Sequence, residues 1–432
     1  MKITLHRPHQ IGGCITVIET DGVKVIIDLG SNLPGTNKEE LTKAQVEEIT
    51  AGADAIFFTH YHGDHTGLIH LVPEAIPQLI GKGAKEVMVC KHSTLARAYK
   101  KRFGADSQKY KDAITILDAA KRMLTYKKAE RIDVGNKGKL FITPYFVSHS
   151  AFDAYMFLIE TEGKRILHTG DFRGHGYLSK GLWKILPGTI GQIDILITEG
   201  TMLSRTDERV LRESVIQKRA RELLQKDGKI NHYVVLCSST DIDRLAGFHA
   251  ACRDTQSGFL VDKYQKDVLD IFTKYAFLNY DGRKSDLFDF SDTLVKGQCN
   301  FKKELFPYSF LAPVRTSQAD YIEKLKYICP DLQLIYSMWN GYLEDKPEQM
   351  NQNIRHIVYD IFGGKKTYLH TSGHADIDTI RKVCQITKPK IGVISIHHDP
   401  SSHLSDVLLN GTRIIDENMD LSPYNIEYKE YN

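Results

Sequence analysis

The stretch HYHGDH occupies residues 60–65 and places three histidines and one aspartate within six positions. It directly follows AIFFT (55–59), a β-branched and aromatic run typical of a buried strand. Neither a strand nor a helix gathers all four side chains on one face, whereas a tight loop that bends at Gly63 can. Imidazole and carboxylate ligands without a thiolate suit zinc, manganese or iron. The candidate ligands here are His60, His62, Asp64 and His65. The alternative is a solvated loop in which Asp64 caps the next helix.

Three further ligand-type residues lie much later in the chain, each just after a predicted strand. His149 follows ITPYFV, Asp171 follows ILHTG and His397 follows IGVISI. A single histidine of this kind is equally well explained as a buried side chain bonded to a backbone carbonyl. The three together indicate that strand ends collect metal ligands. A carboxylate such as Asp171 can bridge two cations about 3.5–4 Å apart.

Composition places the chain among globular proteins of ordinary charge. Its 432 residues are enough for two or three domains, and 42% are hydrophobic. The net charge of +3 does not mark the whole surface for nucleic acid, although it leaves room for a local basic groove. The N-terminus lacks an apolar signal-peptide core, and no stretch approaches the ~20 apolar residues of a membrane span. Seven cysteines without a C-x-x-C pair favour the reducing cytoplasm.

Predicted strands and helices alternate along the chain, which indicates an α/β protein in which one domain is interrupted by another. Asp21-Gly22 between two alternating apolar runs predicts a β-hairpin, and EVMVC (86–90) is typical of a strand. After Gly200 the sequence predicts a long amphipathic helix that ends at Gly228, and a strand–helix–strand–helix order follows it, as in a parallel sheet. We therefore expect a first domain over 1–203, an inserted α/β domain over 204–350, and a return to the first domain over 351–432.

These motifs together resemble the metallo-β-lactamase superfamily: H-x-H-x-D-H, a distant histidine, the T-G-D turn at 169–171 and a final histidine. TEGT (198–201), HTSGHA (370–375) and IHH (396–398) further resemble its β-CASP branch, which includes ribonuclease J and the endonuclease that cleaves pre-mRNA before polyadenylation. The resemblance implies an αββα sandwich carrying an inserted parallel α/β domain, called the β-CASP domain.

The resemblance also implies a role for each candidate residue. Two divalent cations, zinc or manganese, would be held by His60, His62 and His149 on one side and by Asp64, His65 and His397 on the other, with Asp171 bridging. The family usually shows a small residue and an acid after IH, so His398 competes with His397 here. Glu199 would support a metal-bound histidine, His374 would be the general acid, and Asp28 would brace the site. Asp64 and Glu199 are counted with His374 as catalytic.

Two segments are candidates for holding a phosphate. Hydroxyl and backbone N–H donors occur in HTSGHA, and a second set lies at a strand-to-helix turn in LCSSTDIDRL. Ordinary helix capping by the second set explains it equally well. The candidate phosphate-binding residues are Ser239, Thr240, Arg244, Thr371, Ser372 and Gly373.

Basic residues interleaved with aromatic ones run from Arg97 to Arg131, a pattern that suits a single nucleic-acid strand. The alternative is a solvated helix face, since four acidic residues dilute the run.

The function expected from these residues is hydrolysis of phosphodiester bonds in single-stranded nucleic acid. RNA is the expected substrate, DNA remains open, and both endonuclease and 5′-exonuclease action fit the motifs. One alternative is a metallo-hydrolase of a small ester, thioester or lactam. Another is a metal-free scaffold subunit. The resemblance leaves a homodimer open.

Overall fold

The computed structural model describes residues 1–431 except 34–37, 206–207, 209, 277–285, 345–350, 407–410 and 417–420. The chain forms two compact units. Unit 1 comprises Met1–Gly174, Leu178–Glu208 and Gly373–Asn432, and unit 2 comprises His175–Tyr177 and Arg209–Ser372. The sequence pattern placed the inserted domain at 204–350, and its expected limit at residue 350 lies outside the described residues.

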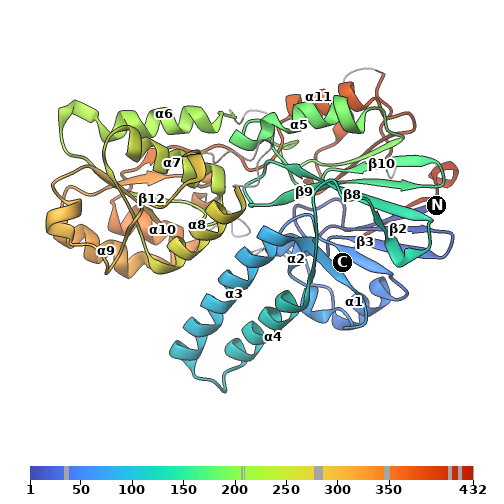
Figure 1. Cartoon of the computed structure of the whole chain (residues 1–432), viewed down its shortest axis with the longest axis horizontal. Coiled ribbons are helices and arrows are strands. Elements are labelled where there is room, and N and C mark those ends of the chain that lie inside the picture. Colours follow the sequence, from blue (N-terminus) through green and yellow to red (C-terminus); the bar gives the residue numbers. More distant parts are fainter. Residues whose placement is uncertain are drawn as a thin grey trace. The chain divides into compact units, whose positions relative to one another are not determined.

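Unit 1 contains two sheets (Figure 1). The first sheet has the strand order β19 (Ile426–Lys429), β1 (Lys2–His6), β2 (Ile15–Thr20), β3 (Val23–Ile27), β4 (Ala55–Phe57), β5 (Gln78–Gly81) and β6 (Leu124–Tyr126). The second has the order β18 (Gly392–Ile396), β11 (Ile195–Glu199), β10 (Lys164–His168), β9 (Ala154–Thr161), β8 (Leu140–Val147) and β7 (Ile132–Asp133). The predicted hairpin at Asp21-Gly22 joins β2 and β3, with positive φ at both turn residues.

The hydrophobic core lies between these two sheets. Ile18 and Phe57 from the first sheet pack in one cluster with Phe157, Ile197 and Ile394 from the second. A second cluster places the outer face of the second sheet against helices α5 (Leu182–Ile185) and α11 (Ile377–Thr387). Helices α1 (Lys43–Thr50), α3 (Lys82–Phe103) and α4 (Gln108–Arg122) flank the first sheet, and α2 (Gly63–Thr66) follows β4. The layers are therefore αββα, as predicted.

One element differs from its prediction. EVMVC (86–90), expected to be a strand, lies within helix α3. The buried residues of α3 include Ala84, Val87 and Met88. Val87 and Met88 follow Ala84 by three and four positions, which is the spacing of one face of a helix. Five residues rich in valine are too few to show this period, and the run was therefore misread.

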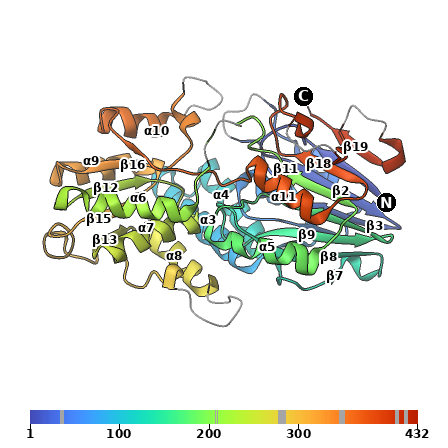
Figure 2. The same cartoon turned by 90° about the horizontal axis from the view of Figure 1, so that it is seen from above.

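Unit 2 is built on a parallel sheet (Figure 2). Its strand order is β14 (Leu294–Val295), β13 (Gly258–Val261), β15 (Phe310–Val314), β12 (His232–Leu236), β16 (Gln333–Tyr336) and β17 (Thr367–Tyr368). Its helices are α6 (Glu213–Leu224), α7 (Ile242–Asp254), α8 (Lys263–Ala276), α9 (Ala319–Ile328) and α10 (Gln352–Arg355). Helices α9 and α10 share a core with Val234 and Ala312 of the sheet. The inserted parallel α/β unit confirms the predicted fold class.

Candidate metal centre

The HYHGDH stretch forms the turn between strand β4 and the short helix α2, with His62 as the helix N-cap. The loop after β3 packs directly on this turn, since the Leu29 N–H donates to the His65 carbonyl at 2.8 Å and the Ser31 N–H to the Gly63 carbonyl at 3.0 Å. A Cβ on Gly30 would lie 1.7 Å from the Asp64 carbonyl oxygen. Only glycine fits at position 30, and its absent side chain allows the two loops to meet.

The first group of donors consists of His60, His62 and His149. One ring nitrogen from each lies within 4.8 Å of the others. The Nδ1–H of His149 donates to the Gly373 carbonyl at 2.7 Å, and its Nε2 is 3.3 Å from His62 Nδ1. The buried Nε2 of His60 has no hydrogen-bond partner among the described residues. Burial holds the pKa of His60 and His149 well below the usual value and lowers that of His62 to about 4. All three rings are therefore neutral at pH 7, the form that binds a metal.

The second group consists of Asp64, His65 and His397. The Nε2 of His397 is 3.3 Å from Asp64 Oδ2, and that of His65 is 3.9 Å from the same oxygen. His397 follows β18 with φ of +55°, a left-handed conformation, and its Nδ1 contacts Thr201 Oγ1 at 2.9 Å. This contact orients the ring so that its Nε2 lies on the side of Asp64.

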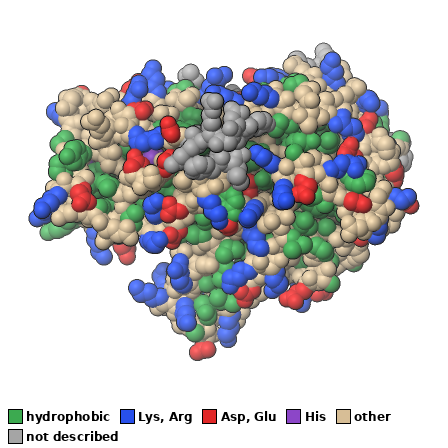
Figure 3. All heavy atoms as spheres, in the orientation of Figure 1, with side chains coloured by type: hydrophobic (Ala, Val, Ile, Leu, Met, Phe, Trp, Pro, Cys, Tyr) green, Lys and Arg blue, Asp and Glu red, His purple; other side chains and the backbone are tan. Residues whose placement is uncertain are grey.

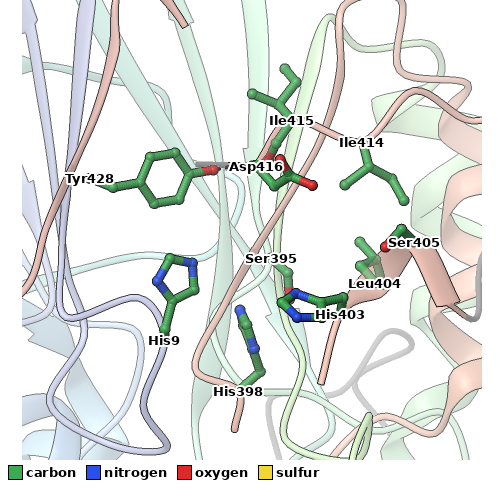
Figure 4. Close-up of a pocket in the computed structure, with 10 residues that line it drawn as sticks. All are labelled: His9, Ser395, His398, His403, Leu404, Ser405, Ile414, Ile415, Asp416 and Tyr428. Atoms are coloured by element: carbon green, nitrogen blue, oxygen red, sulfur yellow. Dashed lines mark hydrogen bonds between the residues drawn. The ribbon is translucent and has the colours of Figure 1, made fainter. Parts of the chain in front are cut away.

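His398, the alternative to His397 as the last metal ligand, lies in a different pocket. Its side chain is beside His9 and His403 (Figure 4), and its ring meets that of His9 edge-on at 5.1 Å between centroids. Among the described residues, the clusters of His, Cys, Asp and Glu side chains that could hold a metal ion include His397 but not His398. The geometry therefore favours His397 as the last ligand.

Asp171 lies between the two groups and is 2% exposed. Its Oδ2 is 3.1 Å from His65 Nε2, 3.8 Å from His149 Nε2 and 4.0 Å from His397 Nε2. Burial raises the pKa of Asp171, but His397 and His65 lower it further, so the net pKa lies well below the usual range. A buried carboxylate with imidazoles on both sides fits a bridging ligand.

Asp28 supports the centre from below. Its carboxylate accepts the backbone N–H of Thr59 at 2.7 Å and the Thr59 hydroxyl at 2.8 Å. It also accepts the Nδ1–H of His65 at 2.8 Å. The bond to Asp28 orients the His65 ring so that its Nε2 faces Asp171, 3.1 Å from Oδ2, which is how a carboxylate orients a metal-binding histidine.

Glu199 and His374 form a second buried pair. Glu199 Oε2 accepts the His374 Nδ1–H at 2.8 Å, and Oε1 accepts the Phe172 N–H at 2.9 Å. The resemblance predicts that Glu199 supports a metal-bound histidine, and the histidine that it contacts in the structure is His374. Burial lowers the pKa of His374, but Glu199 and Asp171 raise it more, and the net pKa is above the usual value. The Nδ1 of His374 lies 3.6 Å from Asp171 Oδ2, so this histidine is part of the same centre.

The candidate phosphate-binding residues divide between the units. Gly373 belongs to unit 1, and Ser239, Thr240, Arg244, Thr371 and Ser372 belong to unit 2. Arg244 is 1% exposed and forms a two-bond ion pair with Glu213, with both N–O distances at 3.0 Å. It also donates to the Thr371 carbonyl at 2.9 Å. A phosphate would have to displace these partners, and the observed contacts favour a structural role for Arg244.

The capping alternative for Ser239 and Thr240 is wrong, whereas phosphate binding by these residues stays a prediction. Helix α7 is capped by Asp241, whose side chain accepts the Arg244 N–H at 3.3 Å, rather than by Ser239 or Thr240. Thr371 Oγ1 donates to the Leu211 carbonyl at 2.8 Å. The Glu213 partner of Arg244 was missed in the sequence because no motif connects residues 31 positions apart on different helices.

Comparisons with known proteins agree with this geometry. The family model of the metallo-β-lactamase superfamily matches residues 12–193. "Endoribonuclease YSH1" of Mycosarcoma maydis is 26% identical over 227 residues, covering 51% of this chain. The chain spans about a quarter of the length of that relative, since the match covers 25% of it. A solved structure, "Crystal Structure of a Protein of Unknown Function from Enterococcus faecalis V583", matches 97% of this chain and 98% of that chain with a TM-score of 0.67 and 17% identity. The last match shows the fold alone.

The geometry predicts that Asp171→Ala abolishes binding of both cations, because the shared carboxylate is lost. We expect the variant to carry about two equivalents of divalent metal fewer than the purified wild-type protein, measured by elemental analysis. His398→Ala is the matched control, since its ring lies outside the centre and metal content should not change. Unchanged metal in Asp171→Ala would contradict the bridging role.

Gly30→Ala is expected to destabilise the protein by about 3 kcal/mol or more, because the new methyl group overlaps backbone atoms of α2. Chemical denaturation measures the change in the free energy of unfolding. Gly188→Ala serves as the control, since a Cβ there meets no atom within 4 Å. Equal stability of the two variants would show that the loops do not pack as described.

Proposed function

We propose that the chain is a metal-dependent hydrolase whose substrate is single-stranded RNA, since the model of the metallo-β-lactamase superfamily matches residues 12–193. The observation that carries the proposal is the arrangement around Asp171, with three ligand-type residues on each side and His374 3.6 Å away. The likeness to a protein named an endoribonuclease supports RNA as the substrate and internal cleavage as the mode. The TEGT and HTSGHA motifs of the β-CASP resemblance add to that support.

The proposed centre would hold one cation at His60, His62 and His149 and the other at Asp64, His65 and His397, with Asp171 shared. When bound, two divalent cations supply the positive charge that activates a water molecule and neutralises a phosphate. Zinc suits the histidine-rich donor set, and manganese is the alternative.

The protein's own contribution to bond cleavage is a proton for the leaving oxygen. In the proposal His374 supplies it from Nε2, since its Nδ1–H is held by Glu199. The His374 side chain is 21% exposed, whereas Glu199 is 1% exposed. A substrate can therefore reach the histidine but not the glutamate, which makes Glu199 a positioning residue. General acid catalysis of this kind contributes about 10²–10⁴-fold in rate.

A digest of end-labelled single-stranded RNA and DNA, with 5′-phosphate or 5′-hydroxyl ends and added zinc or manganese, tests the proposal. We expect RNA to be cut internally whatever its 5′ end, and His374→Ala to slow cleavage about 10²–10⁴-fold without loss of metal. Full activity of His374→Ala would refute its acid role. Hydrolysis of small esters with no cleavage of nucleic acid would favour the alternative function.

A basic surface in unit 1 offers the RNA a place to bind. Helices α3 and α4 pack side by side as a hairpin over residues 82–122 (Figure 1). The hairpin carries eleven Lys and Arg against four Asp and Glu, a net charge of +7, whereas the whole chain has +3. The rest of the chain therefore sums to −4. Lys and Arg side chains are visible over much of the hairpin in Figure 3.

The hairpin tip adds an aromatic group to this charge. Phe103 is 41% exposed, and Lys109 Nζ lies 4.6 Å from its ring centroid. Lys101 and Arg102 beside it are exposed. A base can stack on such a ring while the cations contact phosphates. In the proposal this tip, defined by Lys101, Arg102, Phe103 and Lys109, holds a part of the RNA away from the cleaved bond.

The triple variant Lys101→Gln/Arg102→Gln/Lys109→Gln is expected to bind RNA more weakly and with a smaller salt dependence. The slope of log K against log salt should fall by about 0.7 for each phosphate contact removed. Fluorescence anisotropy with labelled RNA measures both quantities. Lys180→Gln/Lys184→Gln/Lys382→Gln, on and near α5 and α11, is the charge-matched control. An equal effect of the two variants would contradict a dedicated RNA-binding tip.

We also propose that the protein acts in the cytoplasm. All seven cysteines are free thiols, which is compatible with the reducing cytoplasm inferred from their spacing. Within the described part of the chain, no helix is both long and apolar enough to cross a bilayer.

A further inference from the structure

Unit 2 contains a second cluster of ligand-type side chains: His232, Cys329 and Asp331. His232 Nδ1 lies 3.1 Å from Asp331 Oδ2 and 3.1 Å from Cys329 Sγ. Cys329 Sγ lies 3.1 Å from Asp331 Oδ1. Three donors of different chemistry therefore meet within one small triangle. The centre described above uses none of them.

The fold brings these residues together from positions about a hundred residues apart. His232 is the first residue of β12, and β12 pairs in parallel with β16 so that Tyr233 lies opposite Gln333. Cys329 and Asp331 belong to the turn Cys329-Pro330-Asp331-Leu332 that precedes β16, closed by the Leu332 N–H donating to the Cys329 carbonyl at 3.0 Å. Proline at the second position of this turn restricts its φ, so the spacing of thiol and carboxyl is preset.

A thiolate, an imidazole and a carboxylate are ligands that zinc prefers. Tetrahedral zinc with bonds of about 2.0–2.3 Å separates its donors by roughly 3.3–3.6 Å. Cys329 Sγ lies 3.1 Å from both His232 Nδ1 and Asp331 Oδ1, and His232 Nδ1 lies 3.3 Å from the same oxygen, so a few tenths of an ångström of expansion would admit the ion. The side chain of Asp331 is 62% exposed, which leaves solvent access for a water molecule as fourth ligand.

The surroundings favour a cation. Cys329 is the C-cap of helix α9, and the partial negative charge of a helix C-terminus attracts positive charge. His232 is 7% exposed and its ring stacks on Phe310 at 4.6 Å between centroids, which holds the imidazole in place. The buried His232 Nε2 has no hydrogen-bond partner among the described residues, so Nδ1 is the nitrogen that the cluster engages.

The same geometry argues against a reactive thiol. Burial and the hydrogen bond to Asp331 raise the pKa of Cys329 to about 12, so the thiol is protonated at neutral pH when no cation is present. A protonated, 4% exposed thiol is a poor nucleophile. A divalent metal changes this, because it displaces the proton from the sulfur when it binds.

We propose that His232, Cys329 and Asp331 form a third, mononuclear divalent-metal site of zinc type in unit 2, separate from the centre around Asp171. The site holds together the start of β12, the C-terminus of α9 and the turn before β16. Its role is structural, since it ties the amino ends of two paired strands of the parallel sheet to a helix that covers them.

Cobalt substitution of the whole chain tests the site without reference to catalysis. A cobalt–thiolate bond produces near-ultraviolet charge-transfer absorption, and the proposed ligands around Asp171 include no sulfur. We expect the absorption in the cobalt-loaded protein and in Asp171→Ala, which loses the other two ions. We expect it to be lost in Cys329→Ser, with one metal equivalent, and kept in the control Cys299→Ser.

Asp331→Asn provides a second variant at an exposed position in case Cys329→Ser does not fold. It should keep its circular dichroism spectrum and bind cobalt at this site at least about tenfold more weakly. Absence of the absorption in the wild-type protein, or its persistence in Cys329→Ser, would overturn the proposal. Failure of RNA cleavage would leave this result unaffected, since the absorption reports only the thiolate.

Discussion

The structure of unit 1 depends on the burial of Asp171 among imidazoles. Removing a carboxylate from water costs several kcal/mol unless positive charge or hydrogen bonds compensate. The buried carboxylates Asp28, Asp171 and Glu199 raise the pKa of two histidines, His65 and His374, whereas burial keeps His60, His62 and His149 neutral. Negative charge therefore exceeds positive charge at the centre. A divalent cation on each side of Asp171 would neutralise this excess charge, and the imidazole and carboxylate donors suit such a cation.

The two-sheet architecture explains how residues so distant in sequence reach one point. Strands β8, β10, β11 and β18 run in the same direction in the second sheet, so their carboxyl ends share one edge. His149, Asp171, Glu199 and His397 lie at or just after those ends. Strand β4 of the first sheet brings HYHGDH to the same edge. The cores between and behind the sheets hold this edge in register.

The fold class, and the seven ligand-type residues that the structure brings together around Asp171, could be predicted from the sequence because the signals are local; their role as metal ligands stays a prediction. HYHGDH is contiguous, and the other ligands follow recognisable strands. The contacts that orient the centre are not local. Nothing in the sequence indicates that Glu199 bonds to His374, that Arg244 pairs with Glu213, or that Gly30 meets Asp64. EVMVC was wrongly predicted to be a strand, because the helical spacing of its buried residues becomes visible only when the neighbouring turns of α3 are included.

The cluster of His232, Cys329 and Asp331 in unit 2 likewise could not be predicted from local sequence signals. The seven cysteines lack any C-x-x-C spacing, and so the sequence gives no sign of a thiolate metal site. Cys329 and Asp331 are two residues apart, but their histidine partner is supplied by a strand 97 residues earlier. A ligand set divided between a turn and a neighbouring parallel strand leaves no motif, because strand pairing rather than chain spacing sets its geometry.

The ligand-type residues on both sides of Asp171 are proposed to hold a pair of cations. Anomalous X-ray diffraction at the zinc and manganese absorption edges locates such ions directly in a crystal of the metal-loaded protein. We expect two anomalous peaks about 3.5–4 Å apart, one on each side of the Asp171 carboxylate. A centre with no peak, or with the Asp171 carboxylate bonded only to protein side chains, would contradict the proposal.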